Sequence, residues 1–203
     1  YEKIDPVRFI GNYSSGKMGY ALAEACAACG AEVTLISGPV SITARHPAIR
    51  CIRIESAHEM YQTAMQEFPS ADAAILCAAV ADYRPEIQST EKIKREESGD
   101  ITLHLVPNPD IAASLGAIKK PNQIVAGFAL ETNDELHHAT DKLKRKNLDF
   151  IVLNSLKDKG AGFQCDTNKV SILDKQGTLK TYPLKSKQEV AADIVEQLAT
   201  YFK

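Results

Sequence analysis

The chain has 203 residues, a formal net charge of −2 and charged side chains at 25% of its positions. This length is enough for one sizeable hydrophobic core, and the near balance of charge argues against nucleic acid as a partner. No apolar run approaches the roughly 20 residues of a membrane-spanning helix, so we expect no membrane contact. Five cysteines, an odd number at scattered positions, argue against a disulfide scaffold and for the reducing cytoplasm.

The most informative segment, residues 11–19, reads Gly-Asn-Tyr-Ser-Ser-Gly-Lys-Met-Gly. It follows an apolar run at 7–10 and opens into a helical pattern at 18–29, an arrangement that directs backbone N–H groups at an anion. Glycine lets the backbone turn tightly and lets a phosphate come close. A Walker A loop needs Ser or Thr where Met18 stands, so a P-loop is disfavoured. A helix start with incidental glycines is the other alternative.

Strand-like and helix-like segments alternate along most of the chain. Strands are predicted over 31–36, 49–54, 73–79, 101–106, 123–128 and 150–153. Helices are predicted over 18–29, 57–68, 109–118, 132–146 and 186–202. The helix starts carry capping signals, which are a capping box at Ser56, Thr132 and Ser186 and the pair Asn108-Pro109, read as N-cap and first helical residue.

Two stretches depart from this alternation. Residues 82–100 are polar and too long for an ordinary connection, which favours a functional loop. Residues 169–173 and 178–182 flank a Gly-containing turn and predict a hairpin. The fold class is therefore α/β, with a Rossmann-like, mostly parallel sheet, helices on both faces and a small antiparallel C-terminal hairpin. Residues 1–203 form a single domain whose first buried strand we expect upstream, since the chain opens on the polar residues Tyr1-Glu2-Lys3.

Several polar residues stand where ligands bind in such folds. Asp82 follows a buried strand and so lies at the carboxyl edge of the sheet, where it could hold Mg²⁺, a ribose or a substrate hydroxyl, or simply start a loop. Lys92 and Lys94 lie in the polar loop, as solvated charges or as a mobile arm that closes over phosphates. Lys142 and Lys146 share one helix face, as solvated charges or as a phosphate clamp. The visible chemistry is phosphate handling.

Motifs along essentially the whole chain resemble those of phosphopantothenate–cysteine ligase, which in many bacteria is the C-terminal half of a bifunctional coenzyme A biosynthesis protein. The segments that carry the resemblance are 5–10 (Asp-Pro-Val-Arg-Phe-Ile), 12–19, 78–83 (Ala-Ala-Val-Ala-Asp-Tyr), 92–94 (Lys-Ile-Lys), 108–111 (Asn-Pro-Asp-Ile), 127–132 and 142–147. Several long motifs in the same order are far more specific than a single glycine pattern.

The resemblance implies a two-step reaction. The carboxylate of 4′-phosphopantothenate attacks the α-phosphate of a nucleoside triphosphate and releases pyrophosphate. The amine of cysteine then attacks the acyl-nucleotide and releases the monophosphate. The Lys-x-Lys loop and the Gly-Lys-Met-Gly ending resemble bacterial members, which implies CTP, an acyl-cytidylate intermediate and Mg²⁺. An ATP-using ligase of the same family is the alternative.

The resemblance also implies roles for individual residues. It implies nucleotide contacts for Ser14, Gly16, Gly19, Cys77, Ala78, Asp82, Lys92, Pro109, Asp110, Ile111, Ala112, Phe128, Lys142 and Lys146. It implies phosphopantothenate contacts for Arg8, Asn12, Ala78, Ala79 and Asp82. Asn12 and Lys92 would be catalytic, with Lys92 mobile. Mg²⁺ would be held mainly by the triphosphate, with Asp82 as a candidate ligand. A homodimer would share the active site through Arg8, and a flavin-dependent decarboxylase would be fused to or associated with the ligase.

Two further classes of function compete with the ligase. An NAD(P)-dependent or nucleotide-sugar Rossmann enzyme would need G-x-G-x-x-G and an acid at the end of the second strand, where the chain instead reads Ile36-Ser37-Gly38-Pro39. A non-enzymatic nucleotide-sensing module would not need both a lysine loop and the substrate-side residues Asn12 and Asp82.

Overall fold

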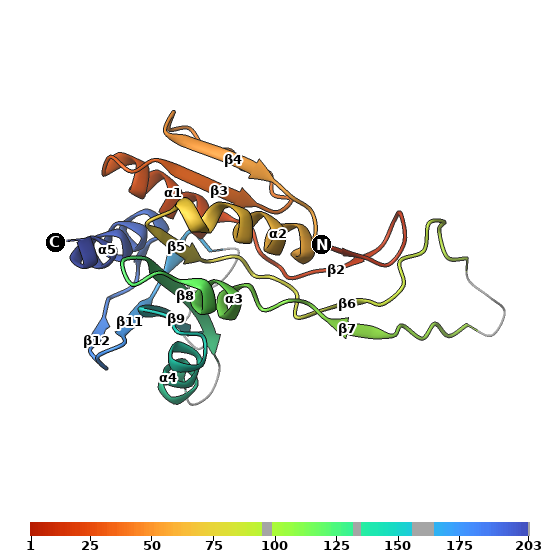
Figure 1. Cartoon of the computed structure of the whole chain (residues 1–203). Helices are drawn as coiled ribbons and strands as arrows, with labels where there is room; N and C mark the ends of the chain where they lie inside the picture. The colour runs from red at the N-terminus through yellow and green to blue at the C-terminus, as the bar shows by residue number, and fades with distance from the viewer. Residues whose placement is uncertain (95–98, 132–134, 156–164, 203) are drawn as a thin grey trace.

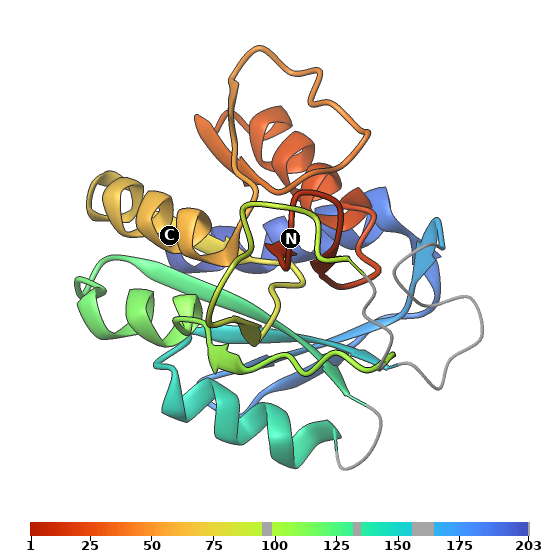
Figure 2. The same cartoon turned by 90° about the vertical axis from the view of Figure 1, so that its right-hand side faces the viewer.

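The computed structural model describes residues 1–94, 99–131, 135–155 and 165–202. One five-stranded sheet forms the centre, with helices on both faces (Figures 1 and 2). The helices are α1 (Lys17–Ala28), α2 (Ala57–Glu67), α3 (Ile111–Ile118), α4 (Glu135–Arg145) and α5 (Lys187–Ala199). No helix in these ranges is long and apolar enough to cross a membrane.

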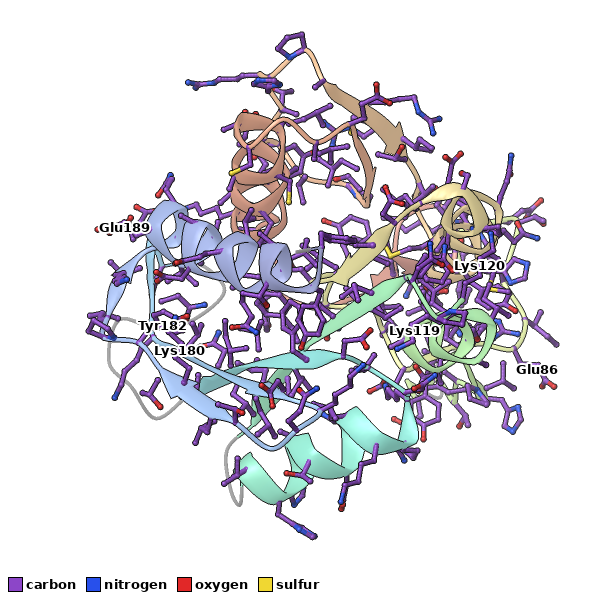
Figure 3. All side chains as sticks on the ribbon, turned by 60° about the vertical axis from the view of Figure 1, so that its left-hand side comes forward. Glu86, Lys119, Lys120, Lys180, Tyr182 and Glu189 are labelled. Atoms are coloured by element: carbon purple, nitrogen blue, oxygen red, sulfur yellow. The ribbon has the colours of Figure 1, made fainter. Side chains whose placement is uncertain are left out.

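The central sheet has the strand order β12-β11-β9-β8-β5. Its strands are β5 (Ala73–Leu76), β8 (Ile124–Glu131), β9 (Phe150–Ser155), β11 (Val170–Asp174) and β12 (Leu179–Thr181). β5, β8 and β9 are parallel, whereas β11 is antiparallel to both of its neighbours. The predicted C-terminal hairpin therefore exists and extends the main sheet. Figure 3 shows its end, where Lys180 Nζ lies 5.0 Å from the centre of the Tyr182 ring.

Alternating residues of the central strands divide the core into two layers. Phe150 and Val152 of β9 pack with α1 and α5, whereas Ile151 and Leu153 pack with α2, α3 and α4. Strand side chains point alternately to opposite faces, so the uninterrupted apolar run of β9 buries both of them. The prediction of helices on both faces is confirmed.

Two of the strands outside the central sheet form a parallel pair of their own. β3 (Val33–Ser37) and β4 (Ile49–Arg53) pair in parallel with each other. A doubly wound sheet has the strand order 3-2-1-4-5-6. In this order, β4 and β3 correspond to strands 3 and 2, and β5, β8 and β9 correspond to strands 4, 5 and 6. No described residue takes place 1, between β3 and β5. All four residues of β5 are accordingly only half-buried, where a strand buried on both faces was predicted.

An elongated arm of two thin ribbons projects from this body (Figure 1). One ribbon pairs β1 (Glu2–Lys3) with β2 (Phe9–Ile10), and the other pairs β6 (Tyr83–Pro85) with β7 (Leu105–Pro107). The apolar run at 7–10 is thus no strand of the main sheet, since its backbone closes a local hairpin. The strand predicted over 101–106 is wrong for 101–104, and β6 was missed because three residues in a polar stretch carry no alternating pattern.

Capping decides the helix boundaries. The Ser56 and Ser186 side chains accept from the backbone N–H of Glu59 and Glu189, so both are N-caps as predicted. The reciprocal bond of the predicted capping box forms at Ser186, whereas Glu59 accepts from the Glu55 N–H instead of the Ser56 N–H. Gly30 follows α1 with a φ of 90°, the left-handed conformation expected of a C′ glycine. The capping box predicted at Thr132 lies outside the described residues. The remaining short elements are β10 (Thr167–Asn168), paired with β13 (Lys185–Ser186), and two 3₁₀ turns, Phe68–Ser70 and Thr200–Phe202.

Two close contacts hold α3 in place, one to the sheet and one to the end of α4. Asp149 is buried at the start of β9, where its carboxylate accepts from the Val125 backbone, Lys119 Nζ and Lys175 Nζ. Figure 3 shows Lys119 at the C-terminal end of α3. At Gly116 of α3, a Cβ would lie 1.9 Å from the Lys146 carbonyl oxygen. The end of α4 and the middle of α3 are therefore in direct backbone contact.

Candidate active site

The glycine loop runs along the start of α1. Gly16 occupies the N-cap position with a φ of 76°, in the left-handed region that favours glycine. Gly19 lies in the first turn of α1, and a Cβ built there would have no atom within 4 Å. The first turn of a helix carries backbone N–H groups without partners in the helix, so this loop can receive a phosphate. Ser14, on the same loop, is exposed.

Asn12 joins the glycine loop to the segment that follows β5. Its Nδ2 donates to the carbonyl oxygens of Ala79 and Val80, at 3.0 and 3.2 Å. Ala78 and Asp82 of that segment are exposed, so their polar groups can reach a ligand. The structure thus brings together the substrate-side residues that the sequence placed far apart.

Cys77 comes at the end of β5, just before this segment. Burial raises the pKa of its thiol to about 12, so the thiol is protonated at neutral pH. Any contact of Cys77 with a ligand would therefore come from its backbone.

Asn108 has a role that the sequence did not reveal. The N-cap of α3 is Asp110, whose Oδ1 accepts from the Ala113 backbone at 3.0 Å, so the prediction of Asn108 as N-cap and Pro109 as first helical residue is wrong. Asn108 instead donates from Nδ2 to the Ala81 carbonyl and from its backbone to the Asp82 carbonyl, both at 2.8 Å. Asn108 and Asp110 are both residue types that cap helices. A local sequence pattern cannot tell which of the two caps α3 and which bonds to another segment.

Lys146 meets the start of α3. Its Nζ lies 2.9 Å from Asp110 Oδ2, and it follows the last residue of α4. Burial opposes ionisation of Asp110, but the Ala113 N–H and the Lys146 ammonium outweigh it and lower the pKa of the carboxyl. The predicted nucleotide segments at 109–112 and 142–146 are therefore neighbours. Phe128, on β8, is half-buried against the core layer of α1 and α5.

A basic hollow lies on the arm. It measures about 630 Å³ and is lined by Arg8, Lys92, Ile93, Lys94, Gly99 and Ile101. Arg8 Nη2 donates to the Ile93 carbonyl at 2.7 Å, while Lys92 is exposed. Lys142 does not line this hollow and borders a separate one along α4. Arg8, Lys92 and Lys94 thus border the same hollow.

Carboxylates that could contact a metal ion are the next feature of the site. Within 1–94, 99–131, 135–155 and 165–202, three or more His, Cys, Asp or Glu side chains nowhere gather as metal ligands do. The exposed carboxylate of Asp82 has the oxygen donors that Mg²⁺ prefers. An Mg²⁺ ion carried by the phosphates and touched by Asp82 would fit this donor set.

Fold and site together define an α/β domain of the doubly wound class, in which the segment of Ala78 and Asp82 follows the carboxyl end of the parallel strand β5. The family model described as "DNA/pantothenate metabolism flavoprotein C-terminal domain" matches residues 1–202. The chain belongs to this family.

Comparisons with individual proteins agree with this membership. The chain is 45% identical over 202 residues to the coenzyme A biosynthesis bifunctional protein CoaBC of Bacillus subtilis (strain 168), covering 100% of this chain and 49% of that protein. It is 55% identical over 199 residues to a "Cysteine/Cysteine sulfinic acid decarboxylase" of an unknown prokaryotic organism, covering 98% of this chain and 55% of that protein. The crystal structure of the C-terminal domain of a CoaBC protein superposes with a TM-score of 0.82 at 41% identity, covering 99% of this chain and 91% of that one.

The chain spans about half the length of these curated relatives.

Proposed function

We propose that this domain is a phosphopantothenate–cysteine ligase that condenses 4′-phosphopantothenate with L-cysteine in coenzyme A biosynthesis. The observation that carries the proposal is the contact of Asn12 with Ala79 and Val80, which joins the glycine loop to the substrate segment. Membership in the pantothenate-metabolism family supports the same substrate class.

The nucleotide in this proposal is CTP. Its phosphates would lie along residues 14–19, where Gly19 leaves room at the helix start. Lys146 and the mobile Lys92 would add positive charge, and Mg²⁺ would neutralise further phosphate charge. A carboxylate and a triphosphate repel each other, so these cations and N–H groups hold them in line for attack.

Residues on the substrate side would direct the two steps. Arg8 would bind 4′-phosphopantothenate as its carboxylate forms the acyl-cytidylate and pyrophosphate leaves. Asn12 would exchange one of its backbone carbonyl partners for the acyl carbonyl, which the cysteine amine then attacks, releasing CMP. Asp82, Ala78 and Ala79 would hold the pantothenate chain.

We propose a homodimer with shared active sites. The arm carries exposed apolar side chains, which on a soluble monomer mark an interaction surface. They are Val7, Phe9, Tyr83, Ile87, Ile101, Leu103 and Leu105. Because Arg8 contacts Ile93 within one chain, Arg8 and the Lys92 loop would enter the partner's site together.

We also propose that the unfilled strand place between β3 and β5 takes a parallel strand from outside residues 1–203. Both flanking strands present an unpaired edge among the described residues, and a parallel strand would complete the doubly wound order. In a longer protein, a flavin-dependent decarboxylase domain would accompany this ligase in the cytoplasm.

The deciding experiment measures pyrophosphate release from the purified chain with 4′-phosphopantothenate, Mg²⁺ and each nucleoside triphosphate, with and without cysteine. CTP-selective release, with 4′-phosphopantothenoylcysteine detected by mass spectrometry, is the expected result. Release selective for ATP would replace CTP by ATP in the proposal, and equal release with both would remove the nucleotide preference from it.

A parallel assay addresses the decarboxylase name of one relative by following CO₂ from cysteine and cysteine sulfinate. CO₂ without pyrophosphate would reject the ligase for this chain. If neither product forms, the assay is repeated on a longer chain that includes the proposed additional strand. Inactivity of that longer chain would also reject the ligase proposal.

A further inference from the structure

Asp5 is among the most deeply buried polar residues of the chain, with 1% of its surface exposed. It lies in the turn between β1 and β2, next to the basic hollow but not facing it as a ligand group. A buried carboxylate needs partners for both oxygens, and its partners here belong to two different segments.

The two oxygens of Asp5 have separate tasks. Oδ1 accepts from the backbone N–H groups of Val7 and Arg8, both at 2.8 Å, and so shapes the turn itself. Oδ2 accepts from Arg8 Nε at 2.9 Å, from Arg8 Nη2, and from the Ile93 backbone N–H at 3.2 Å. One oxygen atom therefore holds both the guanidinium of Arg8 and the backbone next to Lys92.

The lysine segment is tied to this turn at two further points. Arg8 Nη2 donates to the Ile93 carbonyl at 2.7 Å, and the Ser89 N–H donates to the Ile4 carbonyl at 2.9 Å. Burial opposes ionisation of Asp5, but the hydrogen bonds from Arg8, Val7 and Ile93 outweigh it and hold the pKa of the carboxyl well below its ordinary value. The acceptor is thus ionised throughout the physiological range.

We infer that Asp5 is a positioning residue that sets the distance between Arg8 and Lys92 in the active site. This inference rests on the proposed function, because it assigns Arg8 to the substrate and Lys92 to the triphosphate. Lys92 is exposed and directly precedes Ile93, whose backbone Asp5 and Arg8 hold. These bonds therefore fix the backbone position from which the Lys92 side chain extends, while the side chain itself stays mobile.

The test is Asp5→Asn. An Asn side chain keeps one acceptor oxygen for the turn but places an NH₂ group against the donors of Arg8 and Ile93. We expect faster hydrogen exchange of the Ile93 amide, and a fall in kcat of about 10- to 100-fold as Lys92 is misplaced. Asp149→Asn is the matched control, since it alters an equally buried carboxylate that contacts neither Arg8 nor Ile93.

A double-mutant cycle separates positioning from general destabilisation. If Asp5 acts through Lys92, adding Asp5→Asn to Lys92→Ala causes little further loss of kcat, whereas Asp149→Asn combines additively with Lys92→Ala. Additive losses for Asp5, or an Ile93 amide that exchanges at the wild-type rate, would overturn the inference. The exchange measurement does not depend on activity, so it stands even if the ligase assignment fails. Should Asp5→Asn not fold, Ser89→Pro, which removes the Ser89 N–H, replaces it.

Discussion

Individual residues of the site differ in what the fold demands of them. Gly16 has a left-handed backbone and lies close to Val40, so the fold itself favours glycine at this position. Gly19 has no such reason, because it lies in a helix with open space around its Cα. In the proposed function, a phosphate would lie in this open space.

Gly19→Ala should therefore separate folding from binding. Alanine is favoured over glycine in helices, so we expect the free energy of unfolding to rise by roughly 0.5–1 kcal/mol. A methyl group that keeps a phosphate from the backbone N–H groups would remove a charge-assisted hydrogen bond and weaken CTP about 10- to 100-fold. Calorimetric titration and chemical denaturation measure the two effects. Unchanged CTP affinity would remove Gly19 from the phosphate site.

Lys92→Ala should act on catalysis alone. The side chain is exposed, so the melting temperature should stay within about 1 °C of wild type. Loss of a cation that stabilises the transition state should lower kcat about 100- to 1,000-fold. Lys180→Ala removes an exposed lysine at the far end of the sheet and is the control. A Lys92→Ala enzyme with wild-type kcat would contradict the mobile-lysine role.

At the scale of elements, one buried carboxylate joins α3, β8, β9 and β11. Asp149 takes hydrogen bonds from all these neighbours, and Lys119 is itself largely buried. Asp149→Ala would leave that ammonium without its counter-charge and should cost about 3–5 kcal/mol of unfolding free energy in denaturant titrations. The surface pair of Arg50 and Glu67 is more exposed, at 60% and 25% of the two side chains, and Glu67→Ala should cost at most about 1 kcal/mol.

The same carboxylate predicts a pH dependence. Burial raises the pKa of Asp149, but the bonds from Lys119, Val125 and Lys175 dominate and lower it below the ordinary 3.8. A depressed pKa in the folded state means that the stabilisation is present above pH 3.8 and is lost as the pH falls below it. Denaturation curves of wild type and Asp149→Ala should therefore converge as the pH falls below that value. A constant difference would show that ionisation is irrelevant.

At the scale of the whole molecule, the arm and the body would belong to different active sites. Mixing Arg8→Ala with Lys146→Ala should restore activity, because a mixed dimer holds one site with both native residues, giving roughly a quarter of wild-type turnover after random exchange. Mixing Arg8→Ala with Lys92→Ala should restore no activity, since both residues belong to the same arm and no site would receive both native side chains. Absence of recovery in the first mixture would contradict a shared site.

The empty strand place predicts a second whole-molecule effect. If a parallel strand from outside residues 1–203 fills this place, adding such a strand at the N-terminus should raise the melting temperature and slow amide exchange in β3 and β5. A Gly/Ser extension of equal length is the control. Exchange in β3 and β5 that does not respond to either extension would reject the proposed strand.

Sequence reasoning succeeded where one local pattern decided the structure. The apolar run at β9 and the caps at Ser56 and Ser186 needed only neighbouring residues, and they were confirmed. It failed where contacts between distant segments determine the role of a residue. Asn108 was predicted as a helix N-cap and Asp5 was given no role of its own, because their partners at Ala81 and Ile93 lie far along the chain and no local pattern identifies them.

The contact at Gly116 has a consequence for how this domain can change its specificity. A methyl group at residue 116 would clash with the Lys146 carbonyl, and the Lys146 ammonium pairs with Asp110, so α3 and the end of α4 are closely packed at two points. If both segments contact the nucleotide as proposed, we expect them to do so as one unit. A change of nucleotide preference would then come more readily from exchanging side chains on these segments than from moving one segment relative to the other.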